Sequence, residues 1–154
     1  MSGKRLNVPT WEETFIKIAE TVSSRSKDPS TQVGAIIVSD DNRVLSLGYN
    51  GTPRGFDDDD FPWNEKDKNN PYNKYLFVIH AERNAILNYS GNFSNFKKSK
   101  IFVTHFPCNE CAKEIVQVGI KELYYKNGYN EESIETQASR RILNNAGVSV
   151  TLIV

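Results

Sequence analysis

Residues 101–125, IFVTHFPCNECAKEIVQVGIKELYY, decide the fold. An apolar run at 101–104 is followed by a segment with helical spacing at 108–118 and by a second short run at 122–125. Short apolar runs are typical of buried strands, and strands joined through a helix lie parallel in one sheet with a right-handed connection. The stretch therefore predicts a strand–helix–strand unit of an α/β domain.

The same alternation continues on both sides of this unit. A helix is predicted at His80–Tyr89 before it, and a helix at Ser133–Ala146 with a strand at Val148–Ile153 is predicted after it. Gly147 stands between the last two, where a glycine commonly ends a helix. These segments predict three parallel strands separated by helices.

The N-terminal third predicts one further helix and a hairpin. Residues 10–13, TWEE, have the form of a capping box, so a helix is expected from there to about Ser24. Its predicted apolar stripe consists of Trp11, Phe15, Ile18, Ala19 and Val22. The runs 33–38 and 43–49 flank a polar turn at 40–42 and predict two antiparallel strands. We expect a three-layer α/β/α domain with a mixed five-stranded sheet, the hairpin at one side and parallel strands at the other.

Composition limits the function. The 154 residues are 38% hydrophobic and 25% charged, which suits a single domain over residues 1–154. Lys plus Arg total 19 and Asp plus Glu total 19, so the formal charge is +0 and long nucleic acid is not an expected partner. No apolar run approaches the roughly 20 residues of a membrane span, and no signal-peptide core is present. We expect a soluble, cytoplasmic protein without membrane contacts.

Two segments lack regular periodicity. Residues 1–8 read as a short N-terminal tail, and residues 51–75 are rich in Gly, Pro, Asp, Asn and Lys. A loop of this length inside a compact domain is usually functional or disordered. We expect residues 51–75 to form a lid or an effector-binding loop.

The two cysteines, Cys108 and Cys111, lie three residues apart at a predicted helix start. This spacing puts both sulfurs on one helix face, and the positive helix end favours their thiolate forms. His80, at the start of another helix, adds one nitrogen, and the three ligands would hold one zinc ion per chain and leave a fourth position for water. A closed structural site would need His105 or a carboxylate as a fourth ligand, and this alternative stays open.

Glu82 follows His80 by two residues. On a helix it lies about 200° away from His80, badly placed as a second ligand but well placed to touch metal-bound water. A carboxylate there would act as a general acid and base. The pattern His-x-Glu with Pro-Cys-x-x-Cys is typical of zinc-dependent nucleobase deaminases, although either half alone carries little information.

Beyond these motifs the chain resembles the deoxycytidylate (dCMP) deaminases from about Trp11 to Val150. The stretches that carry the resemblance are RSKDPSTQVGA at 25–35, GYNG at 48–51, HAERNAI at 80–86 and FPCNECAK at 106–113. The resemblance implies a cytidine-deaminase-like fold and zinc-dependent hydrolysis of dCMP to dUMP and ammonia, which feeds dTTP synthesis. It also implies that His80, Cys108 and Cys111 hold the zinc and that Glu82 moves protons.

The same resemblance implies a substrate site. Asn50 would bond the deoxyribose hydroxyl and the backbone amide of Ala81 would meet the base carbonyl. Ser26 and Tyr129 match family positions near the substrate phosphate. The cation for that phosphate is not fixed by the sequence, and the candidates are Lys27, Arg25 and Arg54.

Regulation is implied as well. The family resemblance implies a homohexamer that dCTP with Mg²⁺ activates and dTTP inhibits. The effector residues would be Asn50, Gly51, Arg54 and Asp58, from the GYNG segment and the loop after it. The acidic run 57–60 would contribute to Mg²⁺ or effector contacts, or would be solvated only.

Three other functions remain open from the sequence. The first is an enzyme that deaminates dCTP as well as dCMP. This alternative stays open because one sequence does not fix the number of phosphates that the pocket admits. A deaminase of nucleic acid or transfer RNA would share the zinc chemistry, but the neutral charge argues against it. A non-catalytic zinc-containing nucleotide-binding module would have no need of Glu82.

Overall fold

The computed structural model describes residues 2–154 and contains one five-stranded sheet in the order β2-β1-β3-β4-β5. The strands are β1 (Gly34–Ser39), β2 (Val44–Tyr49), β3 (Ser99–His105), β4 (Glu122–Asn127) and β5 (Ser149–Leu152). The pairs β1–β2 and β1–β3 are antiparallel, whereas β3–β4 and β4–β5 are parallel. The predicted mixed sheet, with its hairpin and its parallel side, is confirmed.

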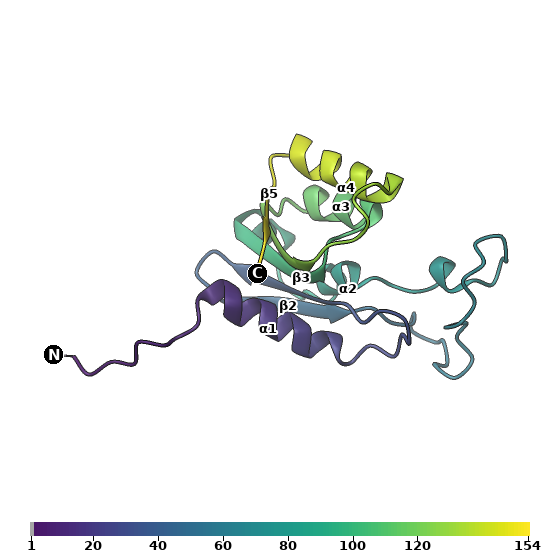
Figure 1. Ribbon diagram of the computed structural model, residues 1–154, viewed down its shortest axis with the longest axis horizontal. Helices are drawn as coiled ribbons and strands as arrows, with labels where there is room; N and C mark the ends of the chain where they lie inside the picture. Colours follow the sequence, from purple (N-terminus) through teal and green to yellow (C-terminus); the bar gives the residue numbers. More distant parts are fainter. Residues whose placement is uncertain (1) are drawn as a thin grey trace.

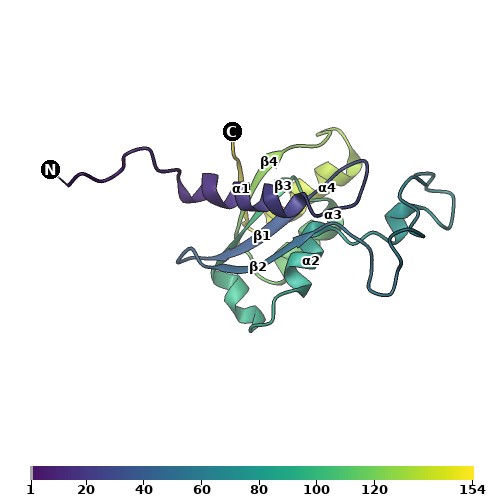
Figure 2. The same ribbon diagram turned by 90° about the horizontal axis from the view of Figure 1, so that it is seen from below.

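Helices cover both faces of this sheet. They are α1 (Trp11–Ser23), α2 (Ala81–Leu87), α3 (Asn109–Gln117) and α4 (Ile134–Asn145), with 3₁₀ turns η1 (Lys74–Leu76) and η2 (Phe93–Lys98). Helix α1 lies on one face, and α3 and α4 lie on the other (Figure 1). The second view places α2 beside β2 and β1, on the side away from α1 (Figure 2). The three-layer α/β/α prediction is therefore confirmed.

Each face of the sheet has its own hydrophobic core. On the α1 face, Phe15, Ile16 and Ala19 pack against Ile36 and Phe102. The prediction that Trp11 belongs to this stripe is wrong, because its side chain stacks on Phe15 in the first helical turn and stays 56% exposed. Ile16 takes the buried position instead. The larger core on the other face joins the inward side chains of α2, α3 and α4 to those of the sheet.

The helix boundaries follow the capping signals. The side chains of Thr10 and Ser133 accept hydrogen bonds from the backbone of the first turns of α1 and α4. Gly147 follows α4 with a φ of +72°, as expected of a glycine after a helix. On β2, a Cβ at Gly48 would collide with the backbone nitrogen of Ala85, so this glycine allows α2 to approach the sheet closely.

The loop between β2 and α2 projects from the sheet in both views (Figures 1 and 2). Residues 52–73 form turns without helix or strand, and the loop is closed at its base by a bridge between Gly51 and Ile79. Its aromatic side chains pack on one another in a small cluster formed by Phe56, Phe61, Trp63, Tyr72 and Phe77. Among residues 2–154, none of the helices has the length and apolar character that a membrane span requires.

Candidate metal centre and active site

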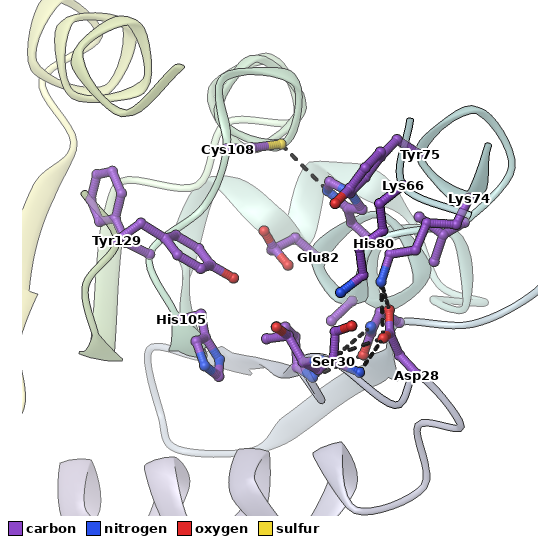
Figure 3. A pocket seen from close by; sticks show the side chains of 16 residues that line it. Asp28, Ser30, Lys66, Lys74, Tyr75, His80, Glu82, His105, Cys108 and Tyr129 are labelled. Atoms are coloured by element: carbon purple, nitrogen blue, oxygen red, sulfur yellow. Dashed lines mark hydrogen bonds and ion pairs between the residues drawn. The ribbon is translucent and has the colours of Figure 1, made fainter. Parts of the chain in front are cut away.

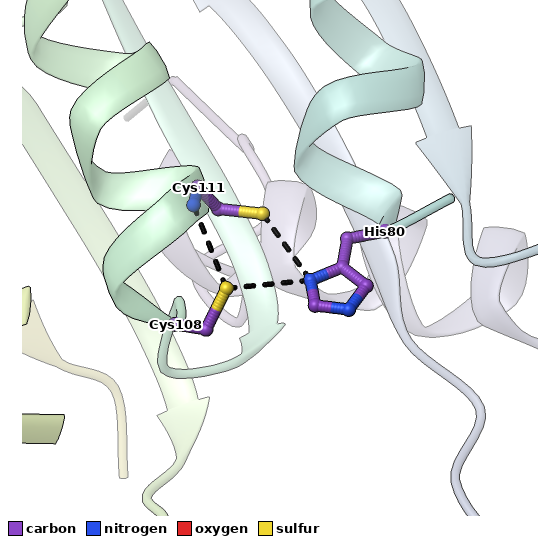
Figure 4. Close-up of side chains that lie close together, drawn as sticks. All are labelled: His80, Cys108 and Cys111. Carbon is purple, nitrogen blue, oxygen red and sulfur yellow. Dashed lines mark hydrogen bonds between the residues drawn. The ribbon is translucent and has the colours of Figure 1, made fainter. Parts of the chain in front are cut away.

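The start of α2 and the start of α3 bring three ligand atoms together (Figure 4). His80 is the N-cap of α2 and Cys108 is the N-cap of α3, while Cys111 lies in the first turn of α3. His80 Nδ1 lies 3.4 Å from the Sγ atoms of both Cys108 and Cys111. All three atoms lie within 4.8 Å of one another.

This donor set fits zinc. Tetrahedral zinc with bonds of about 2.1 Å to nitrogen and about 2.3 Å to sulfur would separate the two donors by about 3.6 Å, close to the observed 3.4 Å. Two sulfurs and one imidazole are also the ligand types that zinc prefers. Within residues 2–154, this is the one group of three or more His, Cys, Asp or Glu side chains with metal-binding spacing. A fourth protein ligand is not part of it.

His105 does not join the group. Its Nδ1 lies 2.9 Å from the Thr104 hydroxyl and its ring stacks on Tyr129 at 5.6 Å. The closed four-ligand alternative through His105 therefore finds no support in the geometry.

Neighbouring groups favour the thiolate form of Cys108, which is the form that binds a metal cation. A hydrogen bond with the Cys111 thiol, assisted by His80 and by the Cys111 backbone N–H, lowers the pKa of Cys108 to about 4. The hydrogen bond with Cys108, together with burial, raises the pKa of the Cys111 thiol. The positive end of α3 and the histidine thus favour the thiolate form of Cys108.

A cavity of about 390 Å³ opens beside the three ligands (Figure 3). His80, Glu82 and Cys108 line it together with side chains from the 28–33 segment, the projecting loop and the ends of β3 and β4. Its volume lies in the range of small-molecule sites, about 300–1,000 Å³.

Glu82 points into the middle of this cavity (Figure 3). Only 4% of the residue is exposed, and burial raises the pKa of its carboxyl group above the usual value. A carboxyl group that binds a proton more tightly is suited to carry one between two reacting atoms. Its position beside the metal ligands, yet outside their group, matches the arrangement expected from the sequence.

Asn50 and Ala81 both line the cavity. The Asn50 side chain accepts a hydrogen bond from Val33 N–H at 2.8 Å and donates one to the Thr31 carbonyl at 3.0 Å. One N–H of the amide is left for a ligand. Ala81 is the first residue of α2, so its backbone N–H has no partner within the helix.

Tyr129 also lines the cavity, but Ser26 and Lys27 do not. The Ser26 hydroxyl donates to the Asn50 carbonyl and accepts from Asp28 N–H, so it supports the cavity wall from behind. Lys27 pairs with Asp58 on the outside. Ser26 and Lys27 were expected beside the substrate phosphate, but neither side chain reaches the cavity that Glu82 lines.

A second pocket of about 320 Å³ holds most of the predicted effector residues. Gly51, Arg54 and Asp58 line it, whereas Asn50 faces the first cavity. All three candidate phosphate cations, Arg25, Lys27 and Arg54, line this second pocket. The acidic run 57–60 does not form a metal-binding group in the described chain, since Asp58 contacts Lys27 and Thr52.

The sequence predicts residues 51–75 as a lid or an effector-binding loop, but it does not identify the residues of the projecting loop that line the first cavity. These residues are Lys66, Lys74, Tyr75 and Val78. A usable signal was present, because Lys74 and its neighbours immediately precede His80 in the chain.

Residues 9–127 match the family model described as the cytidine and deoxycytidylate deaminase zinc-binding region. The chain is 44% identical to the deoxycytidylate deaminases of Pongo abelii and Homo sapiens over 146 residues, which cover 95% of this chain and 81% of each relative. Among solved structures, the dCMP deaminase of cyanophage S-TIM5 in complex with dCMP and dUMP is 32% identical, with a TM-score of 0.71. That match covers 96% of this chain and 100% of the phage chain.

Proposed function

The chain belongs to the family of cytidine and deoxycytidylate deaminases, and from this membership we propose that it hydrolyses dCMP to dUMP and ammonia with one zinc ion per chain. The observation that carries the proposal is the buried Glu82 carboxyl group, which faces the same cavity as His80 and Cys108 of the three-residue ligand group. The identity to deoxycytidylate deaminases over most of the chain supports dCMP as the substrate.

The proposed chemistry divides between the metal and the protein. His80, Cys108 and Cys111 would hold zinc, which supplies a Lewis acid that activates water. Glu82 takes a proton from the attacking water and gives it to the ring nitrogen of cytosine. The water oxygen bonds to C4, Glu82 carries the remaining proton of the new hydroxyl group to the exocyclic amine, and the C4–N bond breaks so that ammonia leaves and the C4 carbonyl of dUMP remains.

The cavity wall supplies recognition. The free N–H of Ala81 would donate to the base carbonyl, and the remaining N–H of Asn50 would bond the deoxyribose hydroxyl. The phosphate of a nucleotide needs a cation, and Lys66 and Lys74 are the lysines that line this cavity. Because Lys74 is paired with Asp28, we assign the phosphate to Lys66.

The test is product formation by zinc-loaded protein offered dCMP, dCTP, deoxycytidine, CMP and a cytosine-containing single strand. We expect dUMP and ammonia from dCMP, with much less turnover of deoxycytidine, which lacks the phosphate. Comparable turnover of dCTP would identify an enzyme for both nucleotides. Turnover of the single strand alone would indicate a nucleic-acid deaminase, and no turnover by folded, zinc-bound protein would indicate a binding module.

We further propose that the second pocket binds the nucleotide effectors, dCTP with Mg²⁺ as activator and dTTP as inhibitor. Arg25, Lys27 and Arg54 line it, and such a group of cations suits a triphosphate. We expect sigmoidal dependence of the rate on dCMP that dCTP with Mg²⁺ makes hyperbolic. A hyperbola that neither dCTP nor dTTP changes would contradict this.

A homohexamer is part of the same proposal. Light scattering coupled to gel filtration measures the mass of the assembly. Six copies of the 17.5 kDa chain are expected, and a monomer that turns over dCMP at full rate would exclude the hexamer as a requirement.

A further inference from the structure

One ion pair in the wall of the first cavity is fully buried. Lys74 Nζ lies 2.8 and 3.0 Å from the two carboxylate oxygens of Asp28, and the two residues are only 5% and 4% exposed. They are 46 positions apart in the sequence. The pair joins the segment after α1 to the projecting loop (Figure 3).

Asp28 shapes its own side of the cavity. Its Oδ1 accepts hydrogen bonds from the backbone N–H groups of Ser30 at 2.8 Å and Thr31 at 3.4 Å. The same segment is then held to Asn50, as described above, through Thr31 and Val33. Ser30, Thr31 and Val33 all line the cavity, so the Asp28 carboxylate organises one wall.

Lys74 belongs to the adjoining wall, which the end of the projecting loop forms. Its carbonyl accepts hydrogen bonds from the N–H groups of Phe77 at 3.1 Å and Val78 at 2.9 Å. Tyr75 and Val78 line the cavity, and the chain reaches His80 two residues later. The ion pair therefore links the two segments that form these adjoining walls.

Stability alone does not account for such a pair. Removing two charges from water costs about as much as their attraction returns, so a buried pair is often replaceable by neutral side chains of similar shape without loss of stability. In this protein the two charges also link two walls of the cavity, which is a second role for the pair.

We propose that Asp28 and Lys74 are positioning residues that hold the two walls of the substrate cavity in register for the nucleotide. The proposal rests on the proposed function. The pair touches neither the zinc ligands nor Glu82 in the described contacts, so its loss should weaken nucleotide binding more than it slows the chemical step.

The test uses the double variant Asp28→Asn, Lys74→Met. Asparagine keeps an acceptor for the Ser30 and Thr31 N–H groups and methionine keeps an apolar stem, so the substitutions remove chiefly the link between the walls. The matched control is Glu20→Gln, Lys126→Met, which removes an exposed ion pair between α1 and β4, 2.8 Å long and away from the cavity.

Four measurements are made on each protein: zinc content, steady-state kinetics with dCMP (kcat and KM), the Kd for dUMP, and hydrogen exchange of residues 28–33. For the double variant we expect full zinc content, KM and Kd raised at least about tenfold, kcat within about threefold, and faster exchange in 28–33. The control should match the unaltered protein in all four.

Wild-type KM and Kd in the folded double variant would overturn the proposal. So would a double variant that does not fold, since the pair would then be structural, or one that loses zinc and kcat together. If the unaltered protein neither deaminates dCMP nor binds dUMP, the proposed function fails on that result. Hydrogen exchange still decides the positioning claim, because unchanged exchange in 28–33 contradicts it.

Discussion

The two pockets differ in how their polar groups are held. In the first, the zinc ligands and Glu82 stand at the starts of α2 and α3, and Glu82 is 4% exposed. In the second, the charged groups come from loops, and the paired side chains of Lys27 and Asp58 are 58% and 36% exposed. Buried groups on regular elements suit chemistry that needs fixed geometry, whereas exposed charges on loops suit binding that varies with the ligand.

The two pockets are nevertheless neighbours along the chain. Lys27 lines the second pocket, and the next residue, Asp28, lines the first. Likewise, Asn50 lines the first pocket and Gly51 lines the second. Helix α2 contributes Glu82 to the first pocket and Asn84 to the second. An effector that moves these shared segments would therefore act directly on the walls of the substrate cavity.

Removal of zinc should have the largest effect on dCMP turnover, and it should impair the first pocket without impairing the second. Because the proposed reaction depends on the metal, dialysis against a chelator should reduce dCMP turnover to background, and added zinc should restore it. Binding of dCTP at the second pocket should persist in the chelated protein if it stays folded. Calorimetry and circular dichroism of the same samples measure both, and full turnover without metal would contradict the assignment.

Glu82→Gln should have the next largest effect, confined to the first pocket. The amide keeps the shape of the side chain but cannot carry the proton, so kcat should fall at least about 10²-fold. Zinc content and the melting temperature should stay near those of the unaltered protein. Turnover retained by this variant would remove Glu82 from its proposed role.

Arg54→Ala should act on the second pocket. Loss of one of its three cations should raise the dCTP concentration for half-maximal activation about tenfold, measured relative to the variant's own rate without effector. Arg43→Ala, which removes an exposed arginine from the β1–β2 turn, is the matched control. An unchanged activation curve for Arg54→Ala would place the effector elsewhere.

Arg83→Ala should have the smallest effect. Arg83 lies on α2 between residues of the two pockets but points to the surface, where it pairs with Glu114 of α3. Partly exposed ion pairs contribute at most about 1 kcal/mol, so the free energy of unfolding in urea should change by less than that. A large change in turnover or in dCTP response would show that the α2–α3 contact takes part in coupling.

The elements and the metal ligands could be predicted because their signals are local. Thr10, Ser133 and Gly147 mark helix ends through interactions with their own neighbours, and Cys108 and Cys111 owe their common face to helical spacing. Trp11 was misplaced because periodicity gives the direction of a side chain but not where the facing sheet ends.

The cavity walls could not be predicted in the same way. Asp28 meets Lys74 across 46 positions, and Lys66 reaches the cavity only because the projecting loop folds back. The position of Lys74 shortly before His80 indicates that this part of the loop lies near the site, but spacing does not show which residues of distant segments meet. Ser26 was expected near the substrate phosphate from the family resemblance, and Lys27 was one of three candidate cations for it, but the side chains of both turn away from the cavity.

We propose that dCMP reacts in the cavity lined by Glu82. A crystal structure of the zinc-loaded Glu82→Gln variant with dCMP tests it most directly, because slow turnover keeps the substrate in place. We expect zinc on His80, Cys108 and Cys111, cytosine beside position 82, and the phosphate near Lys66. Nucleotide bound only in the pocket beside Arg54, with the first cavity empty, would contradict it.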